Sequence, residues 1–129
     1  MRRTLRNIGV VCDQRLTMND HQQRGMAAQA AAAHAFARLL SLAEDRDRDQ
    51  ISYSSACFIA SVFDGIAFPW NVFEMRLVDV GTSDDMLLCL AALRWGNADL
   101  HTLVPNGEQR AMRAIEDWGL VWPWPSTWI

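Results

Sequence analysis

The chain contains no lysine, and all 12 of its basic residues are arginine. Arginine binds carboxylate or phosphate through a planar fork and stacks on aromatic rings, but codon bias in a GC-rich genome is the simpler explanation for this usage. The 15 acidic residues give a net charge of −3, which weighs against a general nucleic-acid-binding protein. The charge is uneven, because residues 1–38 carry +4 and the remainder carries −7.

Cysteine is also scarce, with only Cys12, Cys57 and Cys89 and no CxxC pair. An odd number of widely spaced cysteines is typical of a reduced protein that uses them as small apolar residues. The apolar run at residues 8–12 is too short for a signal peptide. No stretch approaches the roughly 18 apolar residues of a membrane span. We therefore predict a cytoplasmic protein with no membrane association.

Recognisable catalytic motifs are missing. The three histidines, His21, His34 and His101, have no paired spacing and lie near no cysteine in the sequence, so we predict no metal site. Nucleophile-elbow, phosphate-loop and dinucleotide-binding motifs are absent. Asp84 and Asp85 are adjacent at an expected helix start, where they suit capping better than a paired-carboxylate site. We predict no enzymatic activity and no cofactor, with a small enzyme of unrecognised site as an alternative.

Tryptophan, by contrast, is concentrated at the C-terminus. Pro123 and Pro125 exclude a helix there and favour an extended, polyproline-like path. Tryptophans are enriched at binding hot spots, but monomers rarely expose a large apolar patch. The aromatic segment is therefore either a lid on the core or a recognition element, and both interpretations stay open. Four of the six tryptophans lie in this region: Trp118, Trp122, Trp124 and Trp128.

Apolar periodicity predicts an all-α domain over residues 1–129, a compact bundle of about five helices. Residues 1–18 are expected to form an irregular arm or loop, and residues 119–129 an aromatic C-terminal arm. The alternating charges of residues 44–49 indicate a solvated turn. The expected helices cover residues 19 or 20 to 43, 52–64, 72–77, 82 or 83 to 95, and 106–118.

Two of these helices carry specific expectations about burial. The alanine-rich first helix should bury a stripe through Met26 and Leu40, widened by Phe36. The helix that ends at Gly96 is apolar on every side over residues 86–93, which places it at the centre of the bundle. The complete expected stripe of the first helix is Met26, Ala30, Ala33, Ala37 and Leu40, widened by Phe36, Leu39 and Ala43.

The residue types at hand favour binding to another protein. Aromatic side chains and arginines are enriched at interface centres. The expected partner is a host protein or protein complex, and a homodimer is an alternative. A second alternative is a nucleic-acid-binding regulator, because the basic N-terminal tip could contact phosphate. Against it, no expected helix has the basic character of a recognition helix. The predicted contact residues are Trp122, Trp124 and Trp128, followed by Trp70, Arg2, Arg3 and Arg6.

Residues 36–123 resemble a family of small helical proteobacterial proteins of unknown function carried on plasmids and integrative elements. The chain departs from that pattern at Met75 and Leu77, where a tryptophan is expected, and at Val104, where a tyrosine is expected. The matching features are Ala56-x-Phe58, Phe63-Asp64-Gly65, Val78-Asp79, Asp84-Asp85-Met86, a late Trp118 and the pair Trp122-Pro123.

This resemblance implies a biological context but no catalytic residues. Small proteins of mobile elements often counter host defences, including CRISPR surveillance complexes, by direct contact. The resemblance therefore implies an anti-defence inhibitor of the anti-CRISPR type, acting without catalysis.

Overall fold

The computed structural model describes residues 2–45, 47, 49–96 and 98–120, with side chains from residue 20 onward. Over these residues the chain is helical and contains no strand, which confirms the all-α prediction. Two of the helices are short 3-10 helices, labelled η. In chain order the elements are α1 (Arg2–Ala43), α2 (Gln50–Phe63), η1 (Val72–Leu77), α3 (Val80–Trp95), η2 (Leu100–Leu103) and α4 (Gly107–Asp117).

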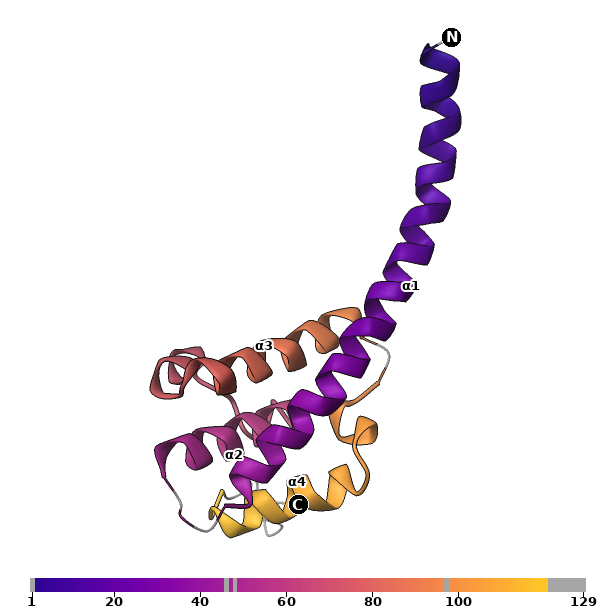
Figure 1. The fold of residues 1–129 in the computed structure, drawn as a ribbon. Coiled ribbons are helices and arrows are strands. Elements are labelled where there is room, and N and C mark those ends of the chain that lie inside the picture. The colour runs from indigo at the N-terminus through magenta and orange to yellow at the C-terminus, as the bar shows by residue number, and fades with distance from the viewer. Residues whose placement is uncertain (1, 46, 48, 97, 121–129) are drawn as a thin grey trace.

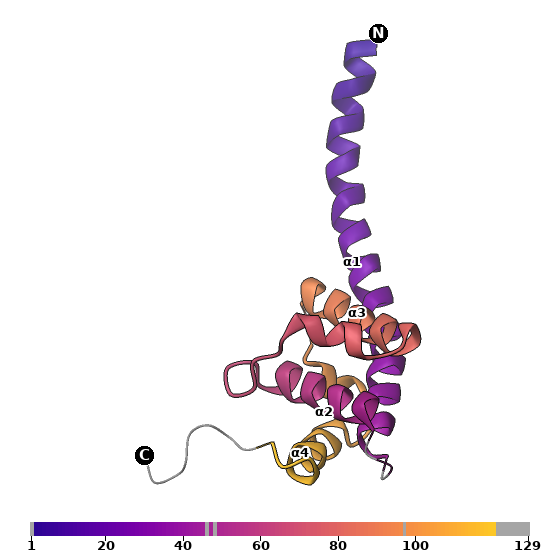
Figure 2. The same cartoon turned by 90° about the vertical axis from the view of Figure 1, so that its left-hand side faces the viewer.

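The long helix α1 organises the molecule. Its C-terminal half packs mainly against α3 and α2, and α4 packs against α2 at the end of the bundle (Figure 1). Its N-terminal half extends well beyond the other helices, and the perpendicular view shows the same separation (Figure 2). The fold is therefore a helical bundle from which half of one helix projects.

The prediction of an irregular arm over residues 1–18 is wrong, because α1 already begins at Arg2. Asp20, expected near the helix start, lies inside the helix, where its carboxylate pairs with Arg24 at 3.0 Å, one turn further on. A helix that has nucleated in an alanine-rich segment adds residues at little further cost. No proline precedes residue 69 to stop it. Helix α1 ends at Ala43, as expected.

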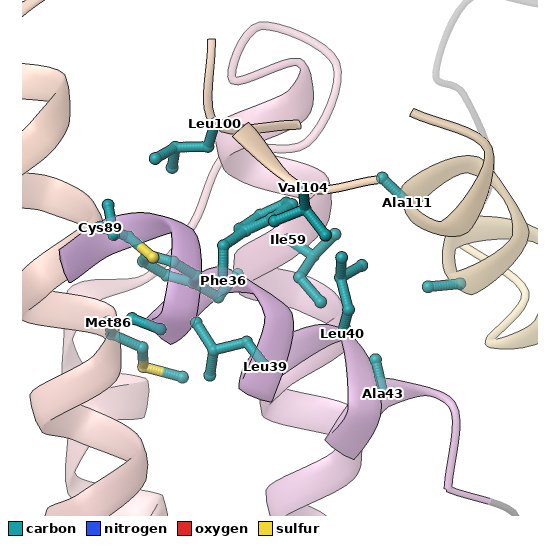
Figure 3. Close-up of a cluster of buried hydrophobic side chains, with 14 of the residues drawn as sticks. Phe36, Leu39, Leu40, Ala43, Ile59, Met86, Cys89, Leu100, Val104 and Ala111 are labelled. Atoms are coloured by element: carbon teal, nitrogen blue, oxygen red, sulfur yellow. The ribbon is translucent and has the colours of Figure 1, made fainter. Parts of the chain in front are cut away.

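The core lies where α1, α2, α3 and η2 meet (Figure 3). Helix α1 contributes Phe36, Leu39 and Leu40, all fully buried. The expected stripe was rotated from the true one, because Met26 is 69% exposed and Ala30 is exposed as well. Other labelled members of the cluster are Ile59 from α2, Met86 and Cys89 from α3, Leu100 from η2, and Val104 and Ala111.

Helix α2 matches its predicted range within two residues. Asp49 caps its start, with Oδ1 accepting a hydrogen bond from the Ser52 amide at 2.8 Å. Ala56, Phe58 and Ile59 form its buried side, as expected. The described residues of the turn before it are exposed, which agrees with the charge pattern.

Helix α3 differs from its prediction at its start and in its surroundings. Asp79 is the cap, rather than Thr82 or Ser83, and accepts from the Thr82 amide. The helix ends at Gly96, whose φ of 66° is the left-handed conformation that glycine favours. Met86 and Cys89 are buried, but Leu87 is 52% exposed, so α3 is not central. It packs one face on α1 and only lightly on α2.

Helix α4 joins the end of the chain to the end of α1. Its buried residues Ala111, Ala114 and Ile115 follow the expected helical spacing. The Trp118 indole Nε1 donates to the carbonyl oxygen of Ala43 at 2.7 Å. This bond satisfies one of the last carbonyls of α1, which have no partner within their own helix.

Candidate protein-binding surface

Large apolar side chains are exposed along η1 and the start of α3. Phe73 is 62% exposed and Val80 is 76% exposed. None of the six residues of η1 is buried, although most of them are apolar. We call this set the outer apolar surface; it consists of Val72, Phe73, Leu77, Val80 and Leu87.

Local structure explains why these side chains face water. Trp70 packs edge-on against Phe58, with ring centroids 5.0 Å apart, and holds the preceding loop on the core. Asn71 then caps η1 by accepting from the Phe73 amide at 3.0 Å. Met75 in η1 and Val78 just after it pack against the core. A 3-10 helix repeats every three residues, so Phe73, two residues before Met75, lies on a different side of η1.

An arginine adds to the outer apolar surface. The Arg76 guanidinium lies over the Phe73 ring, 5.0 Å from its centroid. Such a cation–π pair is worth about 0.5–1 kcal/mol at an exposed site and more when a partner excludes water. On α3, Val80 and Leu87 are seven residues apart and share one helix face, away from Met86 and Cys89. The surface therefore combines aromatic, aliphatic and arginine side chains.

A second feature, an open groove of about 830 Å³, lies between α1 and the start of α3. Arg38 crosses it and binds Asp85 in a fork, with Nε to Oδ2 at 2.9 Å and Nη2 to Oδ1 at 2.7 Å. Asp85 is nearly buried, so it is a paired structural acid rather than the helix cap that was expected. We call this feature the acidic groove; its ionisable lining residues are His34, Arg38, Asp79, Asp84 and Asp85.

The other polar groups of the acidic groove are also engaged locally. The Thr82 hydroxyl donates to Asp79 Oδ1 at 2.5 Å, and this bond holds the pKa of Asp79 below its ordinary value. The Ser41 hydroxyl donates to the carbonyl oxygen of Ala37 at 3.1 Å. The lowered pKa of Asp79 makes its carboxylate a weak base for the Thr82 hydroxyl, and the Ser41 hydroxyl is bonded to a backbone carbonyl, so neither hydroxyl is activated as a nucleophile. The groove therefore offers charge and shape for binding.

Two cysteine thiols belong to the packing. Burial raises the pKa of the Cys89 thiol to about 12 and also raises the pKa of the Cys57 thiol. A thiol with a raised pKa is a poor nucleophile at neutral pH, because only the thiolate reacts. Among the residues that the structure describes, no group of three or more His, Cys, Asp or Glu side chains is arranged to hold a metal ion.

The predicted contact residues are only partly placed. Trp70 is half-buried against the core rather than freely presented. Arg2, Arg3 and Arg6 lie in the first two turns of α1, and their side chains are outside the described set. The remaining three, Trp122, Trp124 and Trp128, lie outside the described residues.

Sequence reasoning missed the outer apolar surface. Residues 72–77 were expected to be helical, but no exposed side was assigned to them. The available signal was the shortness of this helix. A helix of six residues can bury only one narrow side against the core, so its apolar residues on the other sides must contact water or a partner. The fork between Arg38 and Asp85 had no sequence signal, because the residues are 47 positions apart.

Comparison with known proteins gives a family but no described function. Residues 33–119 match the model of a family described as "Family of unknown function (DUF7673)". No curated protein and no solved structure matches the chain. No described helix is long and apolar enough to cross a membrane. The match covers most of the chain, so the chain belongs to DUF7673, and the expected membership of a family of unknown function is confirmed.

Proposed function

We propose that this member of DUF7673 is a non-enzymatic protein that works by binding another protein through its outer apolar surface. The observation that carries the proposal is the exposure of Phe73, Leu77 and Val80, each more than half accessible to solvent. Burial of one such side chain is worth roughly 1.5–3 kcal/mol. Contiguous exposed apolar patches mark interaction sites, whereas singly exposed apolar residues are ordinary. Four of the five residues of this surface fall within residues 72–80.

The chemistry of the surface fits a protein partner better than a small ligand. Aromatic residues and arginine are enriched at the energetic centres of protein interfaces, and Phe73 with Arg76 supplies both. Small-molecule sites are concave and bury most of their ligand, whereas η1 contains no buried residue. In the acidic groove, the fork between Arg38 and Asp85 occupies the charges that catalysis would need.

The proposed partner class is a host defence complex, which the protein would inhibit by direct contact in the cytoplasm. Support for this finer proposal, including an anti-CRISPR role and carriage on a mobile element, comes from the sequence resemblance alone. Trp122, Trp124 and Trp128 stay part of the proposed contact surface as predicted residues.

A phage-plating assay tests the proposal directly. The chain is expressed in bacteria whose CRISPR system blocks a phage, and plaque formation is counted. We expect the wild-type chain to restore plaques and the Phe73→Ser/Leu77→Ser variant to fail. Met112→Ser is the matched control, because Met112 is an exposed apolar residue on α4. Thermal unfolding must show that both variants fold like the wild type.

A photo-reactive amino acid at position 73 then identifies the partner. We expect the residue at 73 to cross-link to a subunit of the defence complex, and the same residue at position 112 to give no such product. Restoration of plaques by the Phe73→Ser/Leu77→Ser variant would contradict the proposed surface. Failure of the wild-type chain against the CRISPR types tested would contradict the anti-CRISPR role.

A further inference from the structure

The first half of α1 packs against no other helix in the described part of the chain. Both views show residues 2–19 extending away from the other helices (Figures 1 and 2). The bundle makes its last contacts with α1 around residues 21–25. There the His21 ring meets the Trp95 ring edge-on at 5.1 Å, and Gly25 is buried close to the Trp95 side chain. We call residues 2–19 the projecting helix.

Its sequence is poor at holding a helix in water unaided. Gly9 costs about 1 kcal/mol relative to alanine, and the adjacent Val10 and Val11 are β-branched. The segment is continuous with the rest of α1, so the helix need not nucleate here. Packing against another surface would offset these local costs.

Helical spacing gives the projecting helix an apolar side. Positions 5, 8, 12 and 16, which hold Leu5, Ile8, Cys12 and Leu16, recur every three to four residues. Such positions share one face of an α-helix. The surface that covers this helix must therefore combine apolar contacts with suitable charge.

Charge restricts what that surface can be. Residues 2–19 contain four arginines and one aspartate, a net charge of +3, while the whole chain carries −3. The rest of the chain therefore carries −6. Two projecting helices would repel one another if they paired, because like charges at an interface cost affinity. An acidic surface is the complementary one.

The acidic groove has this character. Asp79, Asp84 and Asp85 line it against a single arginine, Arg38, and its apolar lining includes Leu42. Leu88, 36% exposed, lies one turn beyond Asp84 on the same side of α3. The groove is lined by residues 34–42 of α1 and by residues 79–85 at the start of α3, a length of roughly 12 Å at 1.5 Å per residue, so it receives about half of the projecting helix.

The groove cannot receive the projecting helix of its own chain. The residues of α1 that line the groove, 34–42, belong to the same continuous helix as residues 2–19. The projecting helix runs away from the other helices in both views, so it could reach the groove of its own chain only if α1 broke. A projecting helix that lies in the groove must therefore come from another molecule.

We propose that the protein forms a two-fold symmetric dimer in which the projecting helix of each copy lies in the acidic groove of the other. Each copy gives one helix and accepts one, so all contacts occur twice and the assembly closes. The charges of the two surfaces are complementary, and the apolar side of the projecting helix meets Leu42 and Leu88. This inference is independent of the outer apolar surface.

Charge reversal on full-length chains tests the dimer. Light scattering and sedimentation over a dilution series should show a dimer for the wild type. Arg2→Glu/Arg15→Glu reverses charge at the two arginines whose positions flank the apolar side of the projecting helix, and Asp84→Arg reverses charge at the groove. Each variant alone should associate at least about tenfold more weakly, because attraction is replaced by repulsion in both copies of the contact. Glu116→Arg, on α4 away from the groove, should associate like the wild type.

Mixing the two variants distinguishes this dimer from other assemblies. The helix variant has an acidic projecting helix and an unchanged acidic groove, whereas Asp84→Arg has an unchanged basic helix and a basic groove. In the mixed pair, each helix therefore meets a groove of opposite charge. The mixture should therefore form heterodimers although each variant alone is monomeric. A monomeric wild type, a dimer that neither reversal weakens, or a mixture that stays monomeric would each overturn the proposal. A dimer strengthened by Arg2→Glu/Arg15→Glu would instead show that the projecting helices pair with one another.

Discussion

Replacement of Gly107 by alanine should be among the most damaging small changes in this protein. Gly107 opens α4 directly beneath η2, and a Cβ atom added there would overlap the carbonyl oxygen of His101 and lie 3.2 Å from its Cα. The atoms in the way are backbone, so no side-chain rotation relieves the clash. Either α4 or η2 must move.

The structure limits how either helix can move. Leu100 in η2 is 1% exposed, and Val104, which follows η2, is 7% exposed. Overpacking costs typically 1–3 kcal/mol, and withdrawing part of a buried leucine adds to that cost. We therefore expect Gly107→Ala to lower the free energy of unfolding by about 3 kcal/mol, and Tm by roughly 10 °C.

Gly25→Ala is the matched control, because it adds the same methyl group to a helix with room for it. A Cβ at Gly25 would lie 3.6 Å from the Trp95 Cβ, an ordinary contact distance. Alanine is also favoured over glycine inside a helix by about 1 kcal/mol. Urea denaturation followed by far-ultraviolet circular dichroism should therefore show a lower free energy of unfolding for Gly107→Ala and a higher one for Gly25→Ala than for the wild type. Equal stability of Gly107→Ala and the wild type would refute the reasoning.

Two further predictions concern contacts with the end of α1. Trp118→Phe removes the donor to the Ala43 carbonyl and should lower the free energy of unfolding by about 1–2 kcal/mol; an unchanged urea midpoint would mean that water replaces the donor. A hydrogen bond from Arg110 lowers the pKa of Glu44 below its ordinary 4.5. The unfolded chain then holds more protons as pH falls below 4.5, so this pair stabilises the fold above that pH and loses its effect in more acidic solution. Arg110→Gln should flatten the pH dependence of urea midpoints there, and an identical slope would contradict this assignment.

Features set by local chemistry could be predicted from the sequence. Asn71 caps η1 and Gly96 ends α3, because a side-chain cap and a left-handed glycine act within a few residues. Helix α2 was placed well for the same reason. The start of α1 was misplaced because the alanine-rich pattern that follows residue 20 says nothing about whether the preceding residues can extend the helix.

Features set by tertiary packing could not be predicted. An all-apolar helix was expected at the centre of the bundle, but the apolar pattern of α3 does not say how many of its faces other helices cover. Helix α1 covers the side with Met86 and Cys89, while Leu87 stays half exposed. The fork between Arg38 and Asp85 is likewise invisible in sequence, because it depends on the register of α1 against α3.

The incomplete burial of α3 links the two proposals. Successive helical residues turn by about 100°, so Asp84 and Leu88 share the side of α3 toward the acidic groove, whereas Leu87 lies on the exposed side about 100° from Leu88. A helix is about 10–12 Å wide with its side chains. A helix seated in the groove would cover Leu88 and leave Phe73 and Leu87 accessible.

A dimer can therefore still present two outer apolar surfaces to other proteins. In that arrangement Asp84→Arg should abolish self-association and leave the restoration of plaques intact, while Phe73→Ser/Leu77→Ser should do the reverse. If either variant removed both activities, the two surfaces would have to be a single interface, and one of the two proposals would have to be abandoned.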